Sequence, residues 1–322
     1  MGWNAARRAT LVAAAVLAAC ALAACASRES VTAAASTDQD FEQLWDYGKP
    51  AESEARFLAE LARHPPRTEA HAQLLTQIAR THSLRRDFDR AHQLLDEVEA
   101  GLAAAGPKVR VRYELERGRA FNSAGDKARA AALFAAAWER AGAAGLDYYA
   151  IDAAHMMAIV APPAGQHAWN LQALALTERT PDPRAKKWLV ALYNNIGWTY
   201  HDAKDYAAAL DMFQKALAAA ETRGRPEAVR IAQWTVARCL RSLGRVEEAL
   251  QRQLALRDDP ATASANDGYV HEEIGESLLA LGRAAEARPS FARAHALLKD
   301  DAHLQANEPQ RLARLRELGE GR

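Results

Sequence analysis

The sequence contains few of the residues that interrupt helices. Its 322 residues include only 12 prolines and 17 glycines, and aromatic residues make up 7% of the chain. Runs of β-branched residues are also scarce, whereas alanine, the strongest helix former, is common. We therefore expect a chain that is helical almost throughout. Its length is sufficient for a substantial core in one large or two ordinary domains.

The chain also lacks a charge excess and a disulfide framework. Lys and Arg together number 41, as do Asp and Glu, so the bulk charge favours neither nucleic acid nor an acidic membrane surface. Its three cysteines are Cys20, Cys25 and Cys239. Since the first two lie in the N-terminal segment discussed below, only Cys239 would remain as a free thiol. The fold is then independent of disulfides and of an oxidising compartment.

Motifs of known enzyme classes are missing as well. The sequence has no phosphate-binding glycine loop, no nucleophile elbow, no HExxH and no paired CxxC. We expect no catalytic residues, no metal site and no cofactor. His201, Asp202 and Asp205 are the group closest to acid–base chemistry, but the position of Asp205 predicts a helix N-cap.

The N-terminus has the pattern of an export signal. Arg7 and Arg8 precede an uncharged apolar run over residues 11–24, which is short for a membrane-spanning helix and suits the hydrophobic region of a signal. The stretch resembles a bacterial lipoprotein signal, because LAAC occurs twice, ending at Cys20 and at Cys25. We expect cleavage after residue 24 and acylation of Cys25, with Cys20 as the alternative site and a plain secretory signal as the alternative reading.

Residues 25–39 are then expected to form the lipid site and a small, polar tether. The resemblance implies a protein anchored by lipid on the periplasmic side of a bacterial envelope. Ala26, rather than Asp, follows Cys25, which by the enteric sorting rule favours the outer membrane. A soluble periplasmic protein is the alternative.

The rest of the chain contains a repeated pattern of small and large residues. Three segments share a Gly, a large residue three positions later, Ala at twelve, Phe at sixteen and Ala at nineteen positions after it. These copies are in register with Gly118, Gly197 and Gly275, and weaker copies with Ala79, Met156 and Ala237. Where two helices cross, small residues allow the backbones to approach and large residues fill the space beside them.

This pattern resembles the tetratricopeptide repeat (TPR) family. The resemblance implies an all-α, right-handed α-solenoid of about six to seven helix-turn-helix repeats, with residues 40–322 as a single domain. We expect the turns within pairs, spaced 38 to 41 residues apart, at Gly48, Arg86, Gly125, Pro163, Lys204, Gly244 and Gly282. The last residues are expected to form a C-terminal cap helix with Asn307 as its N-cap and Leu312 and Leu315 facing inward.

The resemblance further implies that the first helices line a concave surface that binds an extended peptide or a helix of a partner. At the family's inward positions the sequence has Arg119, Asn122, Asn194, Trp198, His201, Trp234, Arg238 and Arg241. Guanidinium groups bind carboxylates, and Trp rings supply apolar area at low entropic cost. We expect an acidic or C-terminal carboxylate of the partner near Arg119, Asn122, Asn194 and Arg238. Alternatively, Trp198 and Trp234 only pack between repeats.

The sequence therefore predicts a non-enzymatic scaffold that binds a partner protein or peptide and is itself a monomer or a weak homodimer. The carboxylate clamp of chaperone-binding TPR proteins is not reproduced, so chaperone binding is not implied. Two other functions stay open. One is a soluble TPR regulator or sensor that binds a small peptide or metabolite, and the other is an enzyme with a site around His201 and Asp202.

Overall fold

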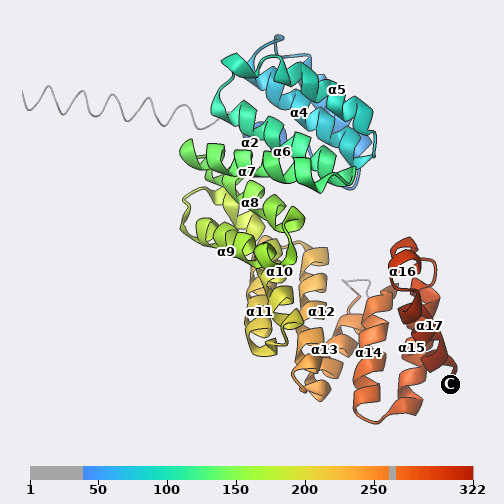
Figure 1. The fold of residues 1–322 in the computed structure, drawn as a ribbon. Helices are drawn as coiled ribbons and strands as arrows, with labels where there is room; N and C mark the ends of the chain where they lie inside the picture. Colours follow the sequence, from blue (N-terminus) through green and yellow to red (C-terminus); the bar gives the residue numbers. More distant parts are fainter. Residues whose placement is uncertain (1–38, 261–265, 322) are drawn as a thin grey trace, which may run out of the picture. The chain divides into compact units, whose positions relative to one another are not determined.

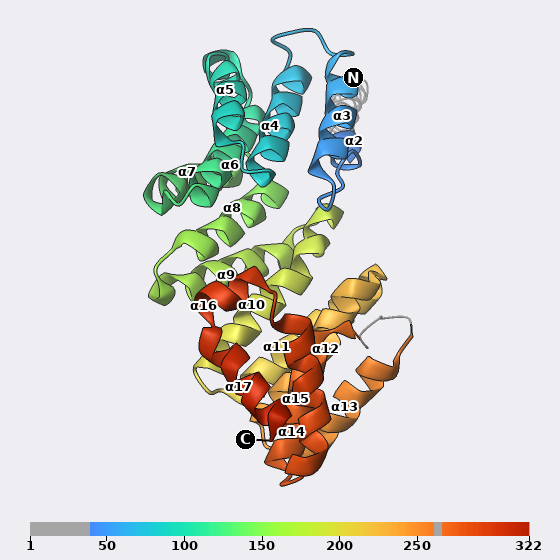
Figure 2. The ribbon, with the colours of Figure 1, turned by 90° about the vertical axis from the view of Figure 1, so that its right-hand side faces the viewer.

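The computed structural model describes residues 39–260 and 266–321. The predicted signal peptide, Cys20, Cys25 and all but the last residue of the predicted tether lie outside the described residues. Within them every regular element is a helix and none is a strand (Figures 1 and 2). The expected all-α helical repeat solenoid is confirmed. By its contacts the chain divides into two compact units, residues 1–109 and 110–322, and each is described by itself.

In the first unit, successive helices pack on one another. The helices are α2 (Gln39–Glu42), α3 (Pro50–Leu61), α4 (Glu69–Leu84) and α5 (Phe88–Glu99), followed by a short 3-10 helix, η2 (Leu102–Ala104). α3 packs on α4, and α4 on α5. The side chains of Thr68 and Asp87 cap α4 and α5 by accepting hydrogen bonds from first-turn amides. Helix α6 (Pro107–Ser123) spans the boundary between the units.

In the second unit, helix pairs follow one another along the chain (Figure 1). The helices are α7 (Lys127–Ala143), α8 (Asp147–Val160), α9 (Pro163–Arg179), η3 (Pro183–Trp188), α10 (Leu189–Asp202), α11 (Tyr206–Arg223), α12 (Pro226–Ser242), α13 (Val246–Asp258), α14 (Gly268–Ala280), α15 (Ala284–Leu298), α16 (Ala302–Asn307) and α17 (Pro309–Glu320). Each helix from α7 to α14 packs on the next α-helix, and α15 packs on α17. We call α6, α8, α10, α12 and α14 first helices and their successors second helices.

The turns within the pairs lie where the repeat predicts them. Five of the predicted turn residues have left-handed backbone conformations, with φ of 63° at Arg86, 95° at Gly125, 62° at Lys204, 79° at Gly244 and 74° at Gly282. This conformation reverses the chain tightly and favours glycine. In the fourth copy Pro162 and Pro163 replace such a turn, because Val160 ends α8 and Pro163 begins α9.

The spacing of small and aromatic residues reflects close helix contact. Gly118, Gly197 and Gly275 on first helices lie against the buried rings of Phe134, Phe213 and Phe291 on second helices. A Cβ atom added to Gly197 would lie 2.5 Å from Cε1 of Phe213, which no side chain tolerates without movement. The glycine therefore makes room for the aromatic ring.

The C-terminus forms the predicted cap helix with one correction. α17 packs on α15, and Leu315 is fully buried while Leu312 packs on the same core. Asn307 is not its N-cap, because Asn307 is the last residue of α16 and its side-chain amide donates to the His303 carbonyl oxygen. The residue before α17 is Glu308, and no side chain caps this helix. Pro309 at the first position, which has no N–H, reduces the need for a cap.

Candidate binding surface

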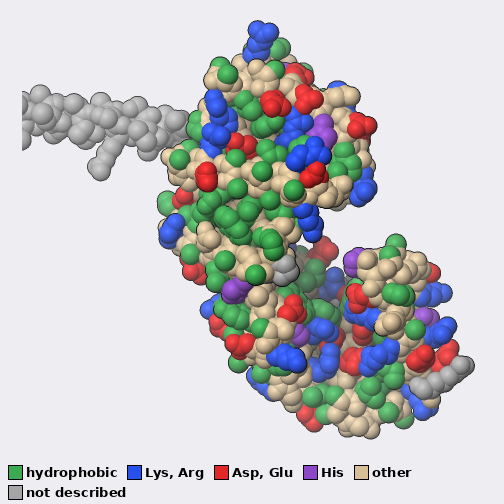
Figure 3. Space-filling model, viewed as in Figure 1, with side chains coloured by type: hydrophobic (Ala, Val, Ile, Leu, Met, Phe, Trp, Pro, Cys, Tyr) green, Lys and Arg blue, Asp and Glu red, His purple; other side chains and the backbone are tan. Residues whose placement is uncertain are grey.

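The predicted binding residues all lie on first helices of the second unit. They are Arg119 and Asn122 on α6, Asn194, Trp198 and His201 on α10, and Trp234, Arg238 and Arg241 on α12. Hydrophobic side chains gather over α7 and α8 on one face of the unit, whereas basic and acidic side chains alternate over α12–α15 (Figure 3). The predicted residues on α10 and α12 form one cluster, apart from Asn194.

An aromatic row crosses from α10 to α14. The ring centroids of Trp198 and Trp234 lie 6.4 Å apart, and those of Trp234 and Tyr269 lie 6.3 Å apart. The indole N–H of Trp234 donates to the Tyr269 carbonyl oxygen (3.1 Å), and Trp198 packs edge-on against Phe213 (5.1 Å). Each of the three row residues remains partly exposed. The rings thus join adjacent repeats and still present apolar area to solvent.

Two arginines beside the aromatic row donate hydrogen bonds to one buried carboxylate. Arg238 lies over both tryptophans, with Cζ 5.7 Å and 5.8 Å from the Trp198 and Trp234 ring centroids. Its Nη1 donates to Glu273 on α14 (2.5 Å), and Arg241 donates to the same carboxylate through Nε (2.8 Å) and Nη2 (2.9 Å). Burial by itself raises the pKa of Glu273, but the hydrogen bonds and charges of Arg241 and Arg238 outweigh it and lower the pKa below its usual range.

One donor in this cluster lacks an acceptor. The Nε atom of Arg238 is buried and has no hydrogen-bond partner among the described residues. Buried N–H groups are nearly always paired, so this donor would gain a hydrogen bond if an acceptor displaced the side chains that cover it.

His201 belongs to the same cluster through a serine and a tryptophan. Its Nε2 is hydrogen-bonded to Ser242 Oγ (2.9 Å), and its ring packs edge-on against Trp198. Burial, followed by the charge of Arg238, lowers the pKa of His201 and keeps the ring neutral. Asp205 caps α11 by accepting from the Ala208 amide (3.1 Å), which confirms its predicted role. No carboxylate accepts from His201 within the described part of the chain, so a Ser–His–Asp arrangement is not formed.

The arginine on α6 forms a separate group. Arg119 donates to Glu116 on its own helix (2.7 Å) and forms an ion pair with Asp152 on α8. Its side chain is only 11% exposed. This guanidinium is therefore occupied by carboxylates of this chain. Asn122, one turn further along α6, is partly exposed.

The acid of the cluster, Glu273, could have been recognised from the repeat itself. Glu273 lies 35 residues after Arg238, about one repeat, so opposite charges recur at nearly equivalent positions of adjacent first helices. The same arrangement continues into the cap helix, where Arg311 donates to Glu272 (2.6 Å) and Arg314 pairs with Glu276. Pairing across neighbouring first helices was the signal that inspection of single copies missed.

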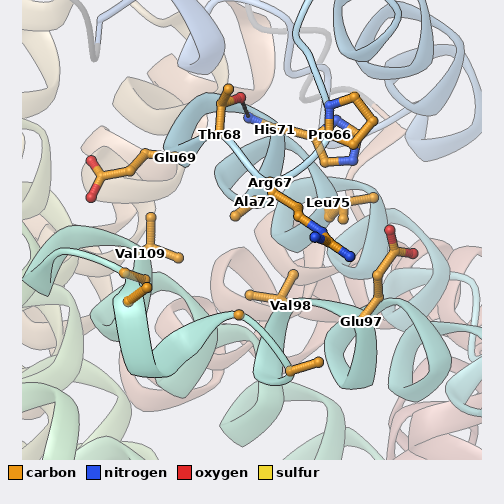
Figure 4. Close-up of a pocket in the computed structure, with 14 residues that line it drawn as sticks. Pro66, Arg67, Thr68, Glu69, His71, Ala72, Leu75, Glu97, Val98 and Val109 are labelled. Atoms are coloured by element: carbon orange, nitrogen blue, oxygen red, sulfur yellow. Dashed lines mark hydrogen bonds between the residues drawn. The ribbon is translucent and has the colours of Figure 1, made fainter.

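A cavity in the first unit opens at the edge where α4 begins and α5 ends. It has a volume of about 610 Å³, and its apolar lining includes Leu75, Val98 and Val109 (Figure 4). Arg67 and Glu97 extend from opposite sides of this cavity and approach each other at its edge (Figure 4). Charges of both signs thus line it.

Asn194, the remaining predicted residue, lines a smaller cavity of about 260 Å³ in the second unit. This cavity lies between the beginning of α10, the end of α11 and the beginning of α12. Its lining includes Ile231 on α12, a large apolar side chain that is 46% exposed.

The described part of the chain contains neither a metal-binding group of side chains nor a membrane-spanning helix. No group of three or more His, Cys, Asp or Glu side chains within residues 39–260 and 266–321 is arranged to hold a metal ion. No described helix combines the length and apolarity needed to span a membrane.

Comparison with known proteins agrees with the fold. A profile of the tetratricopeptide repeat matches residues 168–222, and no curated protein gives a significant match. The structure is similar to BtubC (BKLC) from P. vanneervenii, with a TM-score of 0.54 and 17% identity over 71% of this chain and 94% of that one. It is also similar to the apo form of RapI, with a TM-score of 0.63 and 12% identity over 84% of this chain and 76% of that one.

A third similar structure is the APC/C hetero-tetramer Cut9–Hcn1, with a TM-score of 0.57 and 13% identity over 85% of this chain but 48% of that one. At these identities the likeness concerns the helical repeat fold. The profile match assigns residues 168–222, which lie in α9, α10 and α11, to a tetratricopeptide repeat.

Proposed function

We propose that this chain is a non-enzymatic scaffold that binds a partner protein or peptide along the first helices α10, α12 and α14. TPR-type proteins are generally protein-interaction scaffolds, and the aromatic row offers the rigid, partly exposed rings on which binding surfaces depend. The observation that carries the proposal is the unpaired Nε of Arg238, held between Trp198 and Trp234.

The partner group that suits this position is a carboxylate. Glu273 already holds Nη1 of Arg238 and fixes the guanidinium plane, so Nε is a positioned donor with no rotamer entropy left to lose. A carboxylate oxygen of the partner would complete the hydrogen bonds of Arg238, while apolar atoms of the partner would lie on the two indole rings. Arg241 and His201 support this arrangement through Glu273 and Ser242.

Arg238→Lys tests this proposal in the cell. Lysine retains the charge beside Glu273 but removes the planar Nε–H, and a hydrogen bond involving a charged group contributes about 1.5–3 kcal/mol. We expect affinity capture of the full chain to lose its partner roughly tenfold or more with this variant. Arg252→Lys, at an exposed pair with Glu248 on α13, is the matched control and should retain the partner. Equal recovery with all three proteins would refute the proposal.

We further propose that the scaffold is lipid-anchored in a bacterial envelope through Cys25. The support is the sequence alone: the basic start, the apolar run and LAAC ending at Cys25. Labelling cells with an alkyne palmitate should mark the wild type and Cys20→Ala but not Cys25→Ala. Loss of label with Cys20→Ala alone would move the site to Cys20, and an unlabelled wild type would favour the soluble periplasmic sensor.

A further inference from the structure

The cavity beside Asn194 differs from the surface around it in the sign of its charges. Its lining contains three cations, Lys187, Arg223 and Arg225, and no Asp or Glu occurs among the described residues that form it. The other lining residues are Val190, Ala191, Asn194, Ala216, Ala220, Ala228, Ile231 and Ala232. We call this cavity the cationic notch. In a chain of balanced charge, three cations without an acid around one cavity are a local excess.

The floor of the notch is apolar and closely packed. Ala216 and Ala220 on α11 and Ala232 on α12 are buried, and they leave room for small side chains only. Ile231 and Asn194 stand on first helices, one turn before Trp234 and Trp198 respectively. The notch therefore continues the aromatic row toward the beginning of α10 and α12.

The two arginines of the notch form no ion pair among the described residues. Arg223 donates through Nη1 to the carbonyl oxygen of Lys187 (2.6 Å), which joins the end of α11 to η3. Arg225 is exposed, and its side chain has no ion pair among the described residues. Partial burial, followed by the charge of Arg225, lowers the pKa of Arg223, so this guanidinium is destabilised until an anion approaches.

The cavity at the corresponding place in the first unit has a different set of charges from the cationic notch. The cavity of about 610 Å³ likewise lies between the beginning of one helix, α4, and the end of the next, α5. There, however, Glu69 and Glu97 accompany Arg67, and Glu69 accepts a hydrogen bond from the Gly106 amide (2.8 Å). The fold thus forms a cavity at both edges, but only the notch in the second unit lacks acids of its own.

We infer that the cationic notch binds a carboxylate of an acidic polypeptide segment, with a small side chain beside that carboxylate seated on the alanine floor. This inference rests on the proposed function and locates a second contact for the same partner. The cations come from η3, the end of α11 and the turn before α12 rather than from the inward positions of the first helices. A segment with acids along its length could reach both the notch and Arg238.

A defined peptide tests the notch separately from the partner. The probe is a fluorescein-labelled (Ala-Glu)6 peptide, with (Ala-Gln)6 as the uncharged control, and binding to the full chain is followed by fluorescence anisotropy. We expect Arg223→Gln with Arg225→Gln to weaken (Ala-Glu)6 binding roughly tenfold at low salt, since the peptide loses two exposed ion pairs. The wild-type affinity should also fall as salt is added, because these cations are exposed.

Matched variants make the outcome unambiguous. Arg225→Gln alone removes no side-chain ion pair of the folded protein and should weaken binding severalfold with unchanged thermal unfolding. Arg67→Gln, in the cavity with acids, should have no effect on the probe. The inference is overturned if (Ala-Gln)6 binds as well as (Ala-Glu)6, or if the notch variants bind the acidic peptide like the wild type. If those results occur while Arg238→Lys still loses the cellular partner, the notch is wrong and the scaffold function stands.

Discussion

Replacing Gly197 by alanine isolates the contact on which the helix pairs depend. In an ordinary helix interior this change stabilises by about 1 kcal/mol. Here the new Cβ would lie 2.5 Å and 2.6 Å from Cε1 and Cδ1 of Phe213, whose ring is buried and packed against Trp198. Overpacking of a dense core costs about 1–3 kcal/mol. Taking the upper value for so short an approach, we expect a net loss of about 2 kcal/mol.

Gly142 provides the matched control for this change. It lies in α7, and an added Cβ would meet nothing within 4 Å, so Gly142→Ala should be neutral or stabilising by up to about 1 kcal/mol. Phe213→Leu should relieve the clash, because the repeat copy with Ala79 at the glycine position has Leu95 in place of the aromatic residue. The double variant Gly197→Ala with Phe213→Leu should therefore be more stable than the sum of its single changes predicts.

The assay is hydrogen exchange of α10 and α11 combined with thermal unfolding. Hydrogen exchange reports on the α10–α11 pair separately from the other helices. This resolution is needed because repeat arrays unfold locally, one part at a time. A loss of about 2 kcal/mol corresponds to a fall of roughly 4–8 °C in Tm for a unit of this size. If Gly197→Ala instead raises Tm like Gly142→Ala, the close approach of glycine and phenylalanine is not the determinant of the pairing.

Three further perturbations test other parts of the fold. Glu273→Gln should destabilise the protein by about 2–4 kcal/mol at neutral pH, because two arginines lose a buried carboxylate. The pKa of Glu273 is lowered in the folded protein, so this stabilisation is present above the unfolded pKa near 4.5 and is lost as the pH falls through the folded pKa. Urea unfolding curves of wild type and variant should therefore converge in acid. Asp205→Ala should cost about 1 kcal/mol in the same urea assay by removing the cap of α11, whereas loss below 0.3 kcal/mol would contradict the capping role. Lys204→Gly should stabilise the fold by up to about 1 kcal/mol and Gly244→Ala should destabilise it by about as much, since both positions have positive φ. If the two variants shift Tm in the same direction, this explanation is contradicted.

The sequence predicted the repeat architecture well because the pattern is local. Small residues at crossing points, aromatic residues beside them and turn residues at regular intervals are each decided within one helix pair. The Gly197–Phe213 contact and the left-handed turn at Lys204 follow from this pattern. The end of the chain was less predictable, since Asn307 and Asp301 are both good capping residues and the short α16 intervenes; Asp301 caps α16, and Asn307 ends it.

The binding surface could be predicted only in part, because its electrostatics depend on neighbouring repeats. The first-helix positions of Trp198, Trp234 and Arg238 followed from the resemblance. The pairing of Arg238 with Glu273, and of Arg119 with Asp152, joins residues of different repeats and was not considered. The cationic notch was missed for the same reason, since η3, α11 and the turn before α12 each contribute one cation. Among the predicted residues, only Asn194 pointed to it.

The most direct test of the scaffold function is photo-crosslinking in the organism that makes the protein. A photoreactive amino acid is placed at Ile231 on the first helix α12 or, as control, at Leu171 on the second helix α9; both side chains are exposed, at 46% and 41%. We predict that Ile231 forms a discrete cross-link to one partner and that Arg238→Lys abolishes this cross-link. Cross-linking from Leu171 alone, or from neither position, would contradict binding along the first helices.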